Sequence, residues 1–378
     1  MTVTAEKGLF GRFKHFKERH HVAFEVAFFF AGFVFDYLLL HRIDSVPLLI
    51  HQGTYVTLLV LLIAVDHRIQ VAGKEPSGII GKIVSVRQWV IHFFLGTLFN
   101  AFMIFYFRSA SGWSARVFIS VIALALVMNE MPRFRAWGTP MRVGLWSFAL
   151  TSYLGYLFPL AWHSLNKGLF FLAVACGAGA TFGVWKLFKW FTKDKDWSLK
   201  KGVYPGLVIQ GLLLLAYLLE AVPPVPLSLK YIGIFHQVDV QKVDGVPHYT
   251  LQFMKPPGLI AHALAKDAST GYLFREGDRA YAFASIFAPR HFHDSIFFAF
   301  DFDDPKQGWT SWGKPFRTQV AESQETGFRT YSYTTLSRPG EYRVRVLTED
   351  GREIGREDFT VLKDPAPDEP RTYEVVEK

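Results

Sequence analysis

The stretch GLVIQGLLLLAYLLEAVPPVP, residues 206–226, divides this chain into two parts with different sequence patterns. Most of it is continuously apolar, as a helix that crosses a bilayer must be, and the prolines of PPVP then break the helix. Long apolar runs recur before this stretch, whereas apolar and polar residues alternate after it. We therefore predict an α-helical polytopic membrane domain over residues 1–225 and an all-β domain over residues 226–362.

The composition agrees with this division. The chain has 378 residues, of which 50% are hydrophobic, and its formal net charge is +8. Residues 1–225 hold 22 Lys and Arg against 11 Asp and Glu, whereas residues 226–378 hold 19 against 22. Basic loops between apolar helices set the orientation of membrane proteins, so we expect a lipid bilayer as partner and no nucleic acid. The single cysteine, Cys176, excludes a disulfide within the chain.

A bilayer core about 30 Å thick needs roughly 20 apolar residues per helix. The basic start of the chain is followed by an apolar run without a small-residue cleavage site, so we interpret this run as a retained span. With the N-terminus in the cytoplasm, the inner connections hold 18 Lys and Arg and the outer connections hold 4, which predicts a multi-pass bacterial inner-membrane protein with a periplasmic C-terminal domain. The seven predicted spans are residues 22–41, 46–65, 88–107, 116–131, 141–162, 167–188 and 205–224.

The last third of the chain has the pattern of β-strands. In SIFFAFDF, residues 295–302, apolar side chains alternate with others at period 2. Asp350-Gly351 is a dipeptide that favours a tight hairpin turn. Six or more short strands predict an antiparallel sandwich of the immunoglobulin-like type. The end, residues 363–378, is acidic and rich in proline, so we expect a disordered tail.

The run GFRTYSYTTLSRPGEYRVRVLTEDGREIGREDFTV, residues 327–361, resembles the end of the bacterial domain of unknown function 2914. The membrane part of its multi-span members is similar to three stretches of this chain, namely GFVFDYLLLHRID, LFNAFMIFYFRSAS and the pair Asn129-Glu130. Members often carry His-x-Trp in a middle strand, where this chain has FFAFDFDD, residues 297–304. The resemblance implies a fold without an established catalytic activity, and a few single-span relatives look like partner-binding adaptors.

Asp36 lies within the first predicted span, where a bare carboxylate costs about 2.5 to 3.5 kcal/mol. It shares a helix face with Glu25 and Gly32, so we expect it to be buried between helices. Its neighbours could form a structural hydrogen-bond network, which we favour, or serve a proton, an ion, a lipid-linked substrate or a metal. No metal-ligand motif is present, so we predict neither metal nor other cofactor. The predicted membrane polar cluster is Asp36, His41, His51, Arg108, His163 and Glu220.

A second polar cluster is predicted at the cytoplasmic ends of the spans, and a solvated helix end is the simpler interpretation of its carboxylates. In CGAGATFG, residues 176–183, Gly179 and Gly183 lie one turn apart in an apolar run, which predicts close helix packing rather than a phosphate loop. The second cluster comprises Glu25, His92, Asn129 and Glu130, with Asp66, His67 and Arg87 nearby.

Aromatic and arginine side chains in the β domain suggest a surface for a protein or glycan partner, because sugar faces stack on rings and Arg offers paired donors. The alternative is that the tryptophans are core residues. The candidate residues are Trp309, Trp312, Arg317, Arg329 and Tyr331. A weaker candidate is PRHFHD, where His291, His293 and Asp294 have the donor types of a metal site.

Two functions of different classes fit these observations. The first, which we favour, is a non-catalytic scaffold or accessory protein whose periplasmic β-sandwich binds a protein or envelope glycan. The second is a transporter or enzyme that acts on a lipid-linked substrate through polar residues among the helices. The sequence shows neither an inverted repeat of broken helices nor a membrane-transferase motif, which argues against the second.

Overall fold

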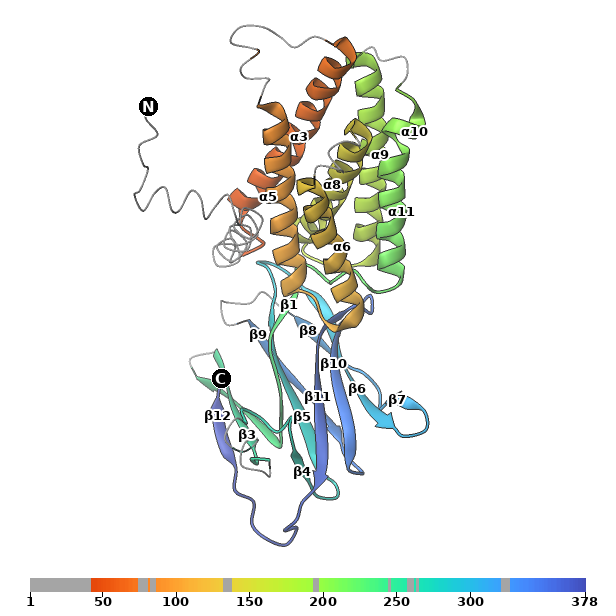
Figure 1. Ribbon diagram of the computed structural model, residues 1–378. Coiled ribbons are helices and arrows are strands. Elements are labelled where there is room, and N and C mark those ends of the chain that lie inside the picture. Colours follow the sequence, from red (N-terminus) through yellow and green to blue (C-terminus); the bar gives the residue numbers. More distant parts are fainter. Residues whose placement is uncertain are drawn as a thin grey trace, which may run out of the picture. The chain divides into compact units, whose positions relative to one another are not determined.

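The computed structural model describes most of the chain after residue 41 (Figure 1). The chain forms two compact units, Met1–Ile43 and Asp44–Lys378, and nearly all of the described residues belong to the second. The predicted first span, with Glu25, Asp36 and His41, lies outside the described residues. The described ranges are residues 42–73, 81, 86–131, 138–192, 197–243, 246–256, 262, 265–320 and 327–378.

The first part of the second unit is helical. Five of the described helices, α3, α5, α6, α8 and α9, are long and apolar enough to cross a membrane. The helices are α3 (Val46–Ala72), α5 (Arg87–Arg108), α6 (Gly112–Glu130), α8 (Gly138–Trp162), α9 (Lys167–Thr192), α10 (Leu199–Gly202) and α11 (Tyr204–Leu218).

The helix α11 is shorter than the span predicted over residues 205–224. Its 15 residues reach about 22 Å, less than the hydrocarbon thickness of about 30 Å. The helix ends at Leu218 because Glu220 takes a positive φ of 54° and the prolines of residues 223–226 follow. The described residues therefore contain five candidate spans and one shorter apolar helix.

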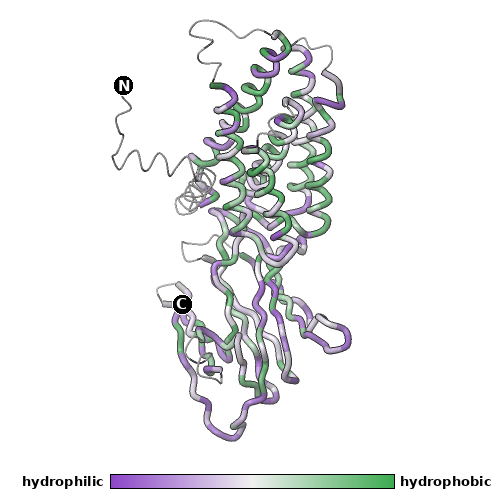
Figure 2. Tube along the Cα trace, in the orientation of Figure 1, coloured by the Kyte–Doolittle hydropathy of each residue, from purple (hydrophilic) through white to green (hydrophobic). Residues whose placement is uncertain are grey.

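Exposed tryptophans lie near both ends of the candidate spans. Trp89 lies at the start of α5 and Trp190 at the end of α9, whereas Trp113 and Trp162 lie at the helix ends next to the β domain (Figure 1). Hydrophobic residues predominate along the helices between these ends (Figure 2). Tryptophans are enriched at both interfaces of a bilayer, so their positions here match those of a membrane-embedded bundle.

Two of the three sheets described in the β domain share one hydrophobic core. The first has the strand order β1-β5-β9, and the second has the order β4-β11-β10-β6-β7, with β8 beside β6. Every pairing within them is antiparallel except β4 with β11, which is parallel. The strands are β1 (Ser228–Phe235), β5 (Arg279–Phe287), β9 (Phe328–Thr335), β4 (Tyr272–Phe274), β11 (Glu353–Lys363), β10 (Gly340–Thr348), β6 (Asp294–Asp304), β7 (Gly308–Ser311) and β8 (Phe316–Val320).

The predicted alternation places the core side chains. On β10, Tyr342, Val344 and Val346 are buried, while Arg343 and Arg345 point to the other face. Asp350-Gly351 joins β10 to β11, and Gly351 takes a φ of 92°, as a tight turn of this kind requires. The sandwich expected from the sequence is therefore present, as a mixed rather than a purely antiparallel arrangement.

A third sheet, which the sequence pattern does not predict, covers the other face of β5. It consists of β2 (Gln237–Val243), β3 (Val246–Phe253) and β12 (Glu374–Glu377), with β3 in the middle. Tyr249 of β3 packs edge-on against Phe283 of β5 at 5.1 Å between ring centroids. Both faces of β5 are therefore covered, which explains its nearly continuous burial.

The tail expected to be disordered is instead held against the domain. Its last strand, β12, pairs with β3, and Lys378 exchanges two backbone hydrogen bonds with Tyr249. Arg275 Nε lies 2.7 Å from Asp364 Oδ2, and Arg371 donates to both carboxylate oxygens of Asp278. The low hydrophobicity that predicted disorder is thus offset by charge-assisted hydrogen bonds and strand pairing.

We predict that Arg371→Gln loosens β12. Losing the charge-assisted bonds to Asp278 costs roughly 1.5 kcal/mol, which corresponds to about tenfold faster amide exchange in β12. Hydrogen exchange with mass spectrometry on the full chain measures this. Arg338→Gln is the control, because Arg338 is half exposed and lies 3.5 Å from Asp304, away from the tail. Unchanged exchange in β12 would show that the pairing of Arg371 with Asp278 does not hold the tail.

Candidate functional site

The turn between β10 and β11 joins the β domain to the helices through a buried ion pair. Arg352 Nε donates to Asp350 Oδ2 at 2.9 Å, and both side chains are buried. Tyr217 of α11 donates its hydroxyl to the same carboxylate oxygen at 2.6 Å. The Arg352 guanidinium lies 4.9 Å from the centroid of the Tyr217 ring, and that ring stacks on Phe170 of α9 at 4.0 Å. A charged turn of the β domain is thereby fixed to two helices.

A second contact lies at the start of β11. Ser111, just before α6, donates its hydroxyl to Glu353 Oε1 at 2.6 Å. Arg356 holds the same carboxylate through Nε at 2.6 Å and Nη2 at 2.7 Å. Gly112 has a φ of 74°, and a Cβ there would lie 2.7 Å from Arg356 Nη2. Glycine suits this position because it takes the positive φ readily and leaves room for the Arg356 guanidinium beside the start of α6.

A third contact joins the loop after α8 to the start of β6. Asp294 Oδ2 accepts a hydrogen bond from the backbone N–H of Leu165 at 2.8 Å, and His163 O accepts one from His293 N at 3.1 Å. We call these three contacts together the junction. Its residues are Ser111, His163, Leu165, Tyr217, His293, Asp294, Asp350, Arg352, Glu353 and Arg356.

Burial opposes ionisation of both aspartates of the junction, but the pKa of Asp350 is lowered and that of Asp294 is raised. Burial opposes ionisation of Asp350, but the charge and hydrogen bond of Arg352 hold its pKa below the usual range. Burial raises the pKa of Asp294, against the opposing effect of the hydrogen bonds from Leu165 and Ser295. Asp350 is therefore ionised at neutral pH and pairs with Arg352 as a full charge.

The described members of the predicted membrane polar cluster have different neighbours. His51 is exposed on α3, with its ring 4.0 Å from that of Tyr55. His163 and Glu220 are exposed beside the junction, and both take positive φ angles, of 55° and 54°. Arg108 lies half-buried at the end of α5. The structure thus does not gather His51, His163 and Glu220 around one point.

The second predicted cluster contains a buried carboxylate between two arginines. Asp66 of α3 is fully buried and accepts from Arg87 Nε of α5 at 2.7 Å and from Gln70 Nε2 at 2.6 Å. Arg142 of α8 donates to Asp66 Oδ2, the oxygen that also accepts from Gln70, whereas Arg87 donates to Oδ1. His67, next to Asp66, hydrogen-bonds Thr139 Oγ1 at 3.0 Å. Arg142 is one of the 18 Lys and Arg assigned above to the inner connections, and its position in the sequence gives no sign that it joins three helices.

His92 and Asn129 form a separate pair. His92 Nδ1 lies 2.9 Å from Asn129 Oδ1, and Asn129 Nδ2 donates to His92 O at 3.0 Å. These two bonds link α5 to α6, as expected for polar side chains that join membrane helices. Glu25 lies outside the described residues, and of Glu130 only the backbone is described. The described members of the predicted cluster therefore separate into the Asp66 group and the His92–Asn129 pair.

A third buried polar group joins α8, α9 and α11. Gln210 Nε2 donates to Ser147 Oγ and Thr151 Oγ1, each at 2.8 Å, and Ser147 Oγ lies 2.9 Å from Thr181 Oγ1. A Cβ on Gly177 would collide with Thr151. Close packing in CGAGATFG is thus present at Gly177. It is not present among the described residues at Gly179 and Gly183, where the prediction placed it and where a Cβ would meet no described atom within 4 Å.

The solvent-facing side of the six-stranded sheet carries a row of ion pairs and an exposed tryptophan. Arg343 Nε lies 2.5 Å from Asp358 Oδ1, and Arg345 Nε lies 2.6 Å from Asp301 Oδ2. The Arg343 guanidinium also lies 3.9 Å from the centroid of the Trp309 ring, a side chain that is 41% exposed. We call this surface the outer face. It comprises Asp301, Trp309, Arg343, Arg345, Arg356 and Asp358.

The five predicted partner-binding residues do not form one surface. Trp309 lies on the outer face, but Trp312 packs 5.5 Å from the buried Tyr342 ring and donates Nε1 to Thr335 O at 3.1 Å. The core interpretation is therefore correct for Trp312. Arg317 of β8 is bonded to Ser295 Oγ at 2.8 Å. Arg329 and Tyr331 lie on β9, in the other sheet.

Two further titratable side chains of the β domain have displaced pKa values, and neither stands out in the sequence. Burial lowers the pKa of His236 to about 4, and its Nδ1 accepts the backbone N–H of Met254 at 3.3 Å. Burial, reinforced by the charge of Asp267, raises the pKa of Glu357 to about 7. His236 is therefore neutral at pH 7, and Glu357 binds or releases a proton near that pH.

Within the described ranges, no group of three or more His, Cys, Asp and Glu side chains could hold a metal ion. In PRHFHD, the Asp294 carboxylate is bonded to backbone N–H groups of Leu165 and Ser295. His293 Nδ1 lies 2.8 Å from His291 O. These contacts give the segment a structural role at the junction.

The apolar helices and the β-sandwich together define a candidate membrane protein with a C-terminal β domain. Residues 306–361, from the turn before β7 into β11, match the family described as "Protein of unknown function (DUF2914)". The C-terminal region therefore carries this domain, which confirms the resemblance predicted from residues 327–361.

Other comparisons give weaker likenesses. No curated protein matches the chain. An immunoglobulin-like protein of Pseudomonas aeruginosa is similar over 35% of this chain and 97% of its own, with 10% identity and a TM-score of 0.19. An alkylpurine DNA glycosylase of Pseudomonas fluorescens bound to DNA is similar over 85% and 99%, with 14% identity and a TM-score of 0.22. At these TM-scores neither likeness carries an argument about function.

We predict that Asp350→Asn destabilises the chain more than removal of the whole ion pair does. The single change leaves Arg352 buried without a counter-charge, which costs about 3 to 5 kcal/mol, whereas the double change Asp350→Asn with Arg352→Met removes both charges. Thermal unfolding in detergent measures this. A double variant as unstable as the single one would show that the loss of stability does not come from leaving the Arg352 charge unpaired.

A second prediction concerns pH. Because the pKa of Glu357 is raised in the folded chain, folding is favoured while this group is protonated, and that stability is lost as pH rises from about 4.5 through about 7. Glu357→Gln should remove this dependence and stabilise the β domain above pH 7 by about 1 to 2 kcal/mol, since partial exposure screens the full effect. Unfolding midpoints from pH 5 to 8, with Glu341→Gln as an exposed control, test this. Parallel curves for all three proteins would contradict it.

Proposed function

We propose that this protein is a non-catalytic scaffold of the bacterial inner membrane, which presents its β domain to a protein or envelope glycan in the periplasm. The observation that carries the proposal is the outer face. One side of the six-stranded sheet packs into the core, whereas the other carries a half-exposed tryptophan beside aligned arginines and carboxylates.

The chemistry of the outer face suits both kinds of partner. The Trp309 ring offers an apolar surface on which a sugar ring or an aromatic side chain stacks. The guanidinium groups of Arg343 and Arg345 are held in place by Asp358 and Asp301, so little side-chain freedom is lost when a partner binds. Trp and Arg are also the residues most enriched in binding hot spots.

The periplasmic placement is supported by the distribution of charge. The proposal counts the shorter helix α11 as the seventh span: with a cytoplasmic N-terminus, the inner connections then hold 18 Lys and Arg and the outer connections 4, in agreement with the positive-inside rule. The exposed tryptophans at both helix ends are consistent with two membrane interfaces, and the β domain follows the end marked by Trp113 and Trp162.

An alternative function is transport or chemistry on a lipid-linked substrate by the membrane part. The fully buried Asp66 between Arg87 and Arg142 is the observation that favours it, because intramembrane charges are costly and often functional. The carboxylate oxygens are, however, already bonded to Arg87, Gln70 and Arg142. This arrangement supports a role in fixing the helices more than a role in catalysis.

The scaffold proposal predicts that a partner is captured at Trp309. A photoreactive amino acid in place of Ser311, which lies on the same side of β7, should crosslink in living cells to one defined species, and Trp309→Ala should reduce that product several-fold. A photoreactive residue in place of Tyr333 is the matched control, because Tyr333 also pairs with an arginine, Arg279 at 4.9 Å, but on the other sheet.

Two outcomes would contradict the scaffold proposal. Equal crosslinking from the positions of Ser311 and Tyr333 would show that the partner does not bind preferentially at the outer face. A product unaffected by Trp309→Ala would show that the tryptophan does not recognise the partner. Digestion of the product with a protease or with a muramidase then distinguishes a protein from a peptidoglycan partner.

A further inference from the structure

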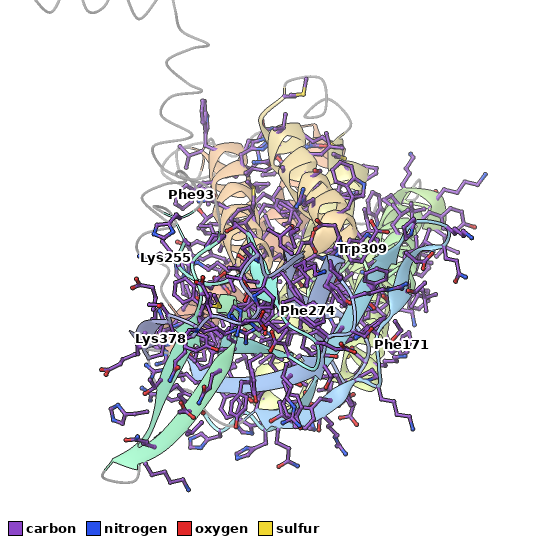
Figure 3. The ribbon with its side chains drawn as sticks, turned by 90° about the horizontal axis from the view of Figure 1, so that it is seen from below. Phe93, Phe171, Lys255, Phe274, Trp309 and Lys378 are labelled. Atoms are coloured by element: carbon purple, nitrogen blue, oxygen red, sulfur yellow. The ribbon has the colours of Figure 1, made fainter. Side chains whose placement is uncertain are left out.

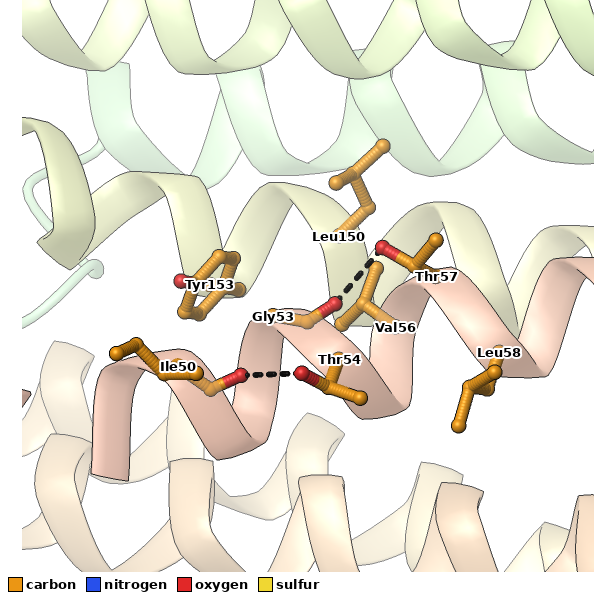
Figure 4. A pocket seen from close by; sticks show the side chains of 8 residues that line it. All are labelled: Ile50, Gly53, Thr54, Val56, Thr57, Leu58, Leu150 and Tyr153. Atoms are coloured by element: carbon orange, nitrogen blue, oxygen red, sulfur yellow. Dashed lines mark hydrogen bonds between the residues drawn. The ribbon is translucent and has the colours of Figure 1, made fainter. Parts of the chain in front are cut away.

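The surface between α3 and α8 contains an apolar groove. Its volume is about 480 Å³, and it is open on its outer side. Six of its lining residues come from one side of α3 and two from α8 (Figure 4). The lining residues are Ile50, Gly53, Thr54, Val56, Thr57, Leu58, Leu150 and Tyr153.

The polar atoms that line this groove are already bonded within the protein. Thr54 Oγ1 donates to Ile50 O at 2.8 Å, and Thr57 Oγ1 donates to Gly53 O at 2.8 Å (Figure 4). The Tyr153 hydroxyl donates to Leu49 O at 2.9 Å. The three hydroxyl groups thus already donate hydrogen bonds within the protein, so an apolar ligand in the groove leaves none of these donors unpaired.

The shape of the groove depends on a glycine. A Cβ on Gly53 would lie 2.9 Å from the Tyr153 hydroxyl oxygen, so glycine lets α3 approach Tyr153 of α8 closely there. The neighbouring Ile50 and Leu58 remain exposed, at 64% and 41%. The result is a recess beside apolar side chains that project outward from α3.

The surroundings of this recess are set by its position on two candidate membrane spans, α3 and α8. In a bilayer, lipid chains are as apolar as the helix surface, so contacts there depend on packing and shape rather than on the hydrophobic effect. An empty recess would forfeit dispersion contacts along its walls. A flexible hydrocarbon chain can fill it without leaving any polar group unpaired.

We propose that the groove between α3 and α8 binds one acyl chain of a membrane phospholipid. The chain lies against Ile50, Thr54 and Leu58, with Gly53 and Tyr153 beneath it. The groove holds the chain for longer than the smooth lipid-facing surface of other helices does, because it contacts the chain on several sides.

The test uses the full chain reconstituted in phosphatidylcholine vesicles that contain a phosphatidylcholine with a diazirine on one acyl chain. After irradiation, mass spectrometry of peptides counts the lipid adducts at each residue. We expect several-fold more adducts at Ile50, Thr54 and Leu58 than at Val121 and Leu124 of α6, which are comparably exposed apolar positions, at 49% and 56%.

Variants at Thr57 separate groove binding from general lipid contact. Thr57→Phe fills the recess and should abolish the enrichment on α3, whereas Thr57→Ala leaves room for the chain and should retain it. Adducts on α6 should not change in either variant, which also reports that the protein remains folded.

Three results would overturn this proposal. Equal labelling of α3 and α6 would mean that the groove holds lipid no better than any exposed helix. Absence of adducts on α3 would mean that protein covers this face, either other residues of this chain or a second copy. Enrichment that survives Thr57→Phe would mean that the recess is not the cause.

Discussion

The ion pair between Asp350 and Arg352 is the interaction on which the arrangement of this protein depends most. Burying two charges is expensive, and the cost is recovered only with close geometry and additional hydrogen bonds. Here Tyr217, Thr348 and the Pro223 carbonyl supply those bonds. Because these partners come from α11, from β10 and from the segment after α11, the pair has all of these hydrogen bonds only when the helices and the β domain are both in place.

The same two strands connect the junction to the outer face. The Asp350-Gly351 turn beside the helices joins β10 to β11, and these strands carry Arg343, Arg345 and Asp358 further along. Glu353 and Arg356 of β11 add a second attachment close to α6. A partner that binds the outer face would therefore contact strands that are fixed directly to the membrane helices, which suits a scaffold that holds a partner in a defined position.

The buried polar groups among the helices have a complementary role. Asp66 with its two arginines joins α3, α5 and α8, and Gln210 with its hydroxyl partners joins α8, α9 and α11. Such groups fix which helix faces meet, a choice that apolar packing alone leaves open. We propose that this bundle meets lipid at the tryptophans of the helix ends and at the groove beside Tyr153.

The sequence was most informative where the physical signal is local. Alternation along residues 295–302 and the Asp350-Gly351 turn predicted β6 and the β10–β11 hairpin, and apolar length predicted the candidate spans. It was least informative where distant residues meet. Arg142 resembles a loop charge until α8 brings it to Asp66, and the tail resembles a disordered segment until Arg371 reaches Asp278. Trp309 and Trp312 look equivalent in GWTSWG, yet Trp309 is a surface residue and Trp312 packs against the core. Figure 3 shows Trp309 and the C-terminal Lys378 on different sides of the β domain.

The proposed function depends on the β domain lying outside the cytoplasm, and the side of one exposed residue tests this directly. Lys306 lies on the exposed turn between β6 and β7, and Cys176 is the chain's single cysteine. Lys306→Cys in a Cys176→Ser background can be exposed to a membrane-impermeant maleimide in intact spheroplasts. We predict full labelling without permeabilisation. Labelling only after the membrane is disrupted would place the β domain in the cytoplasm and contradict the proposed function.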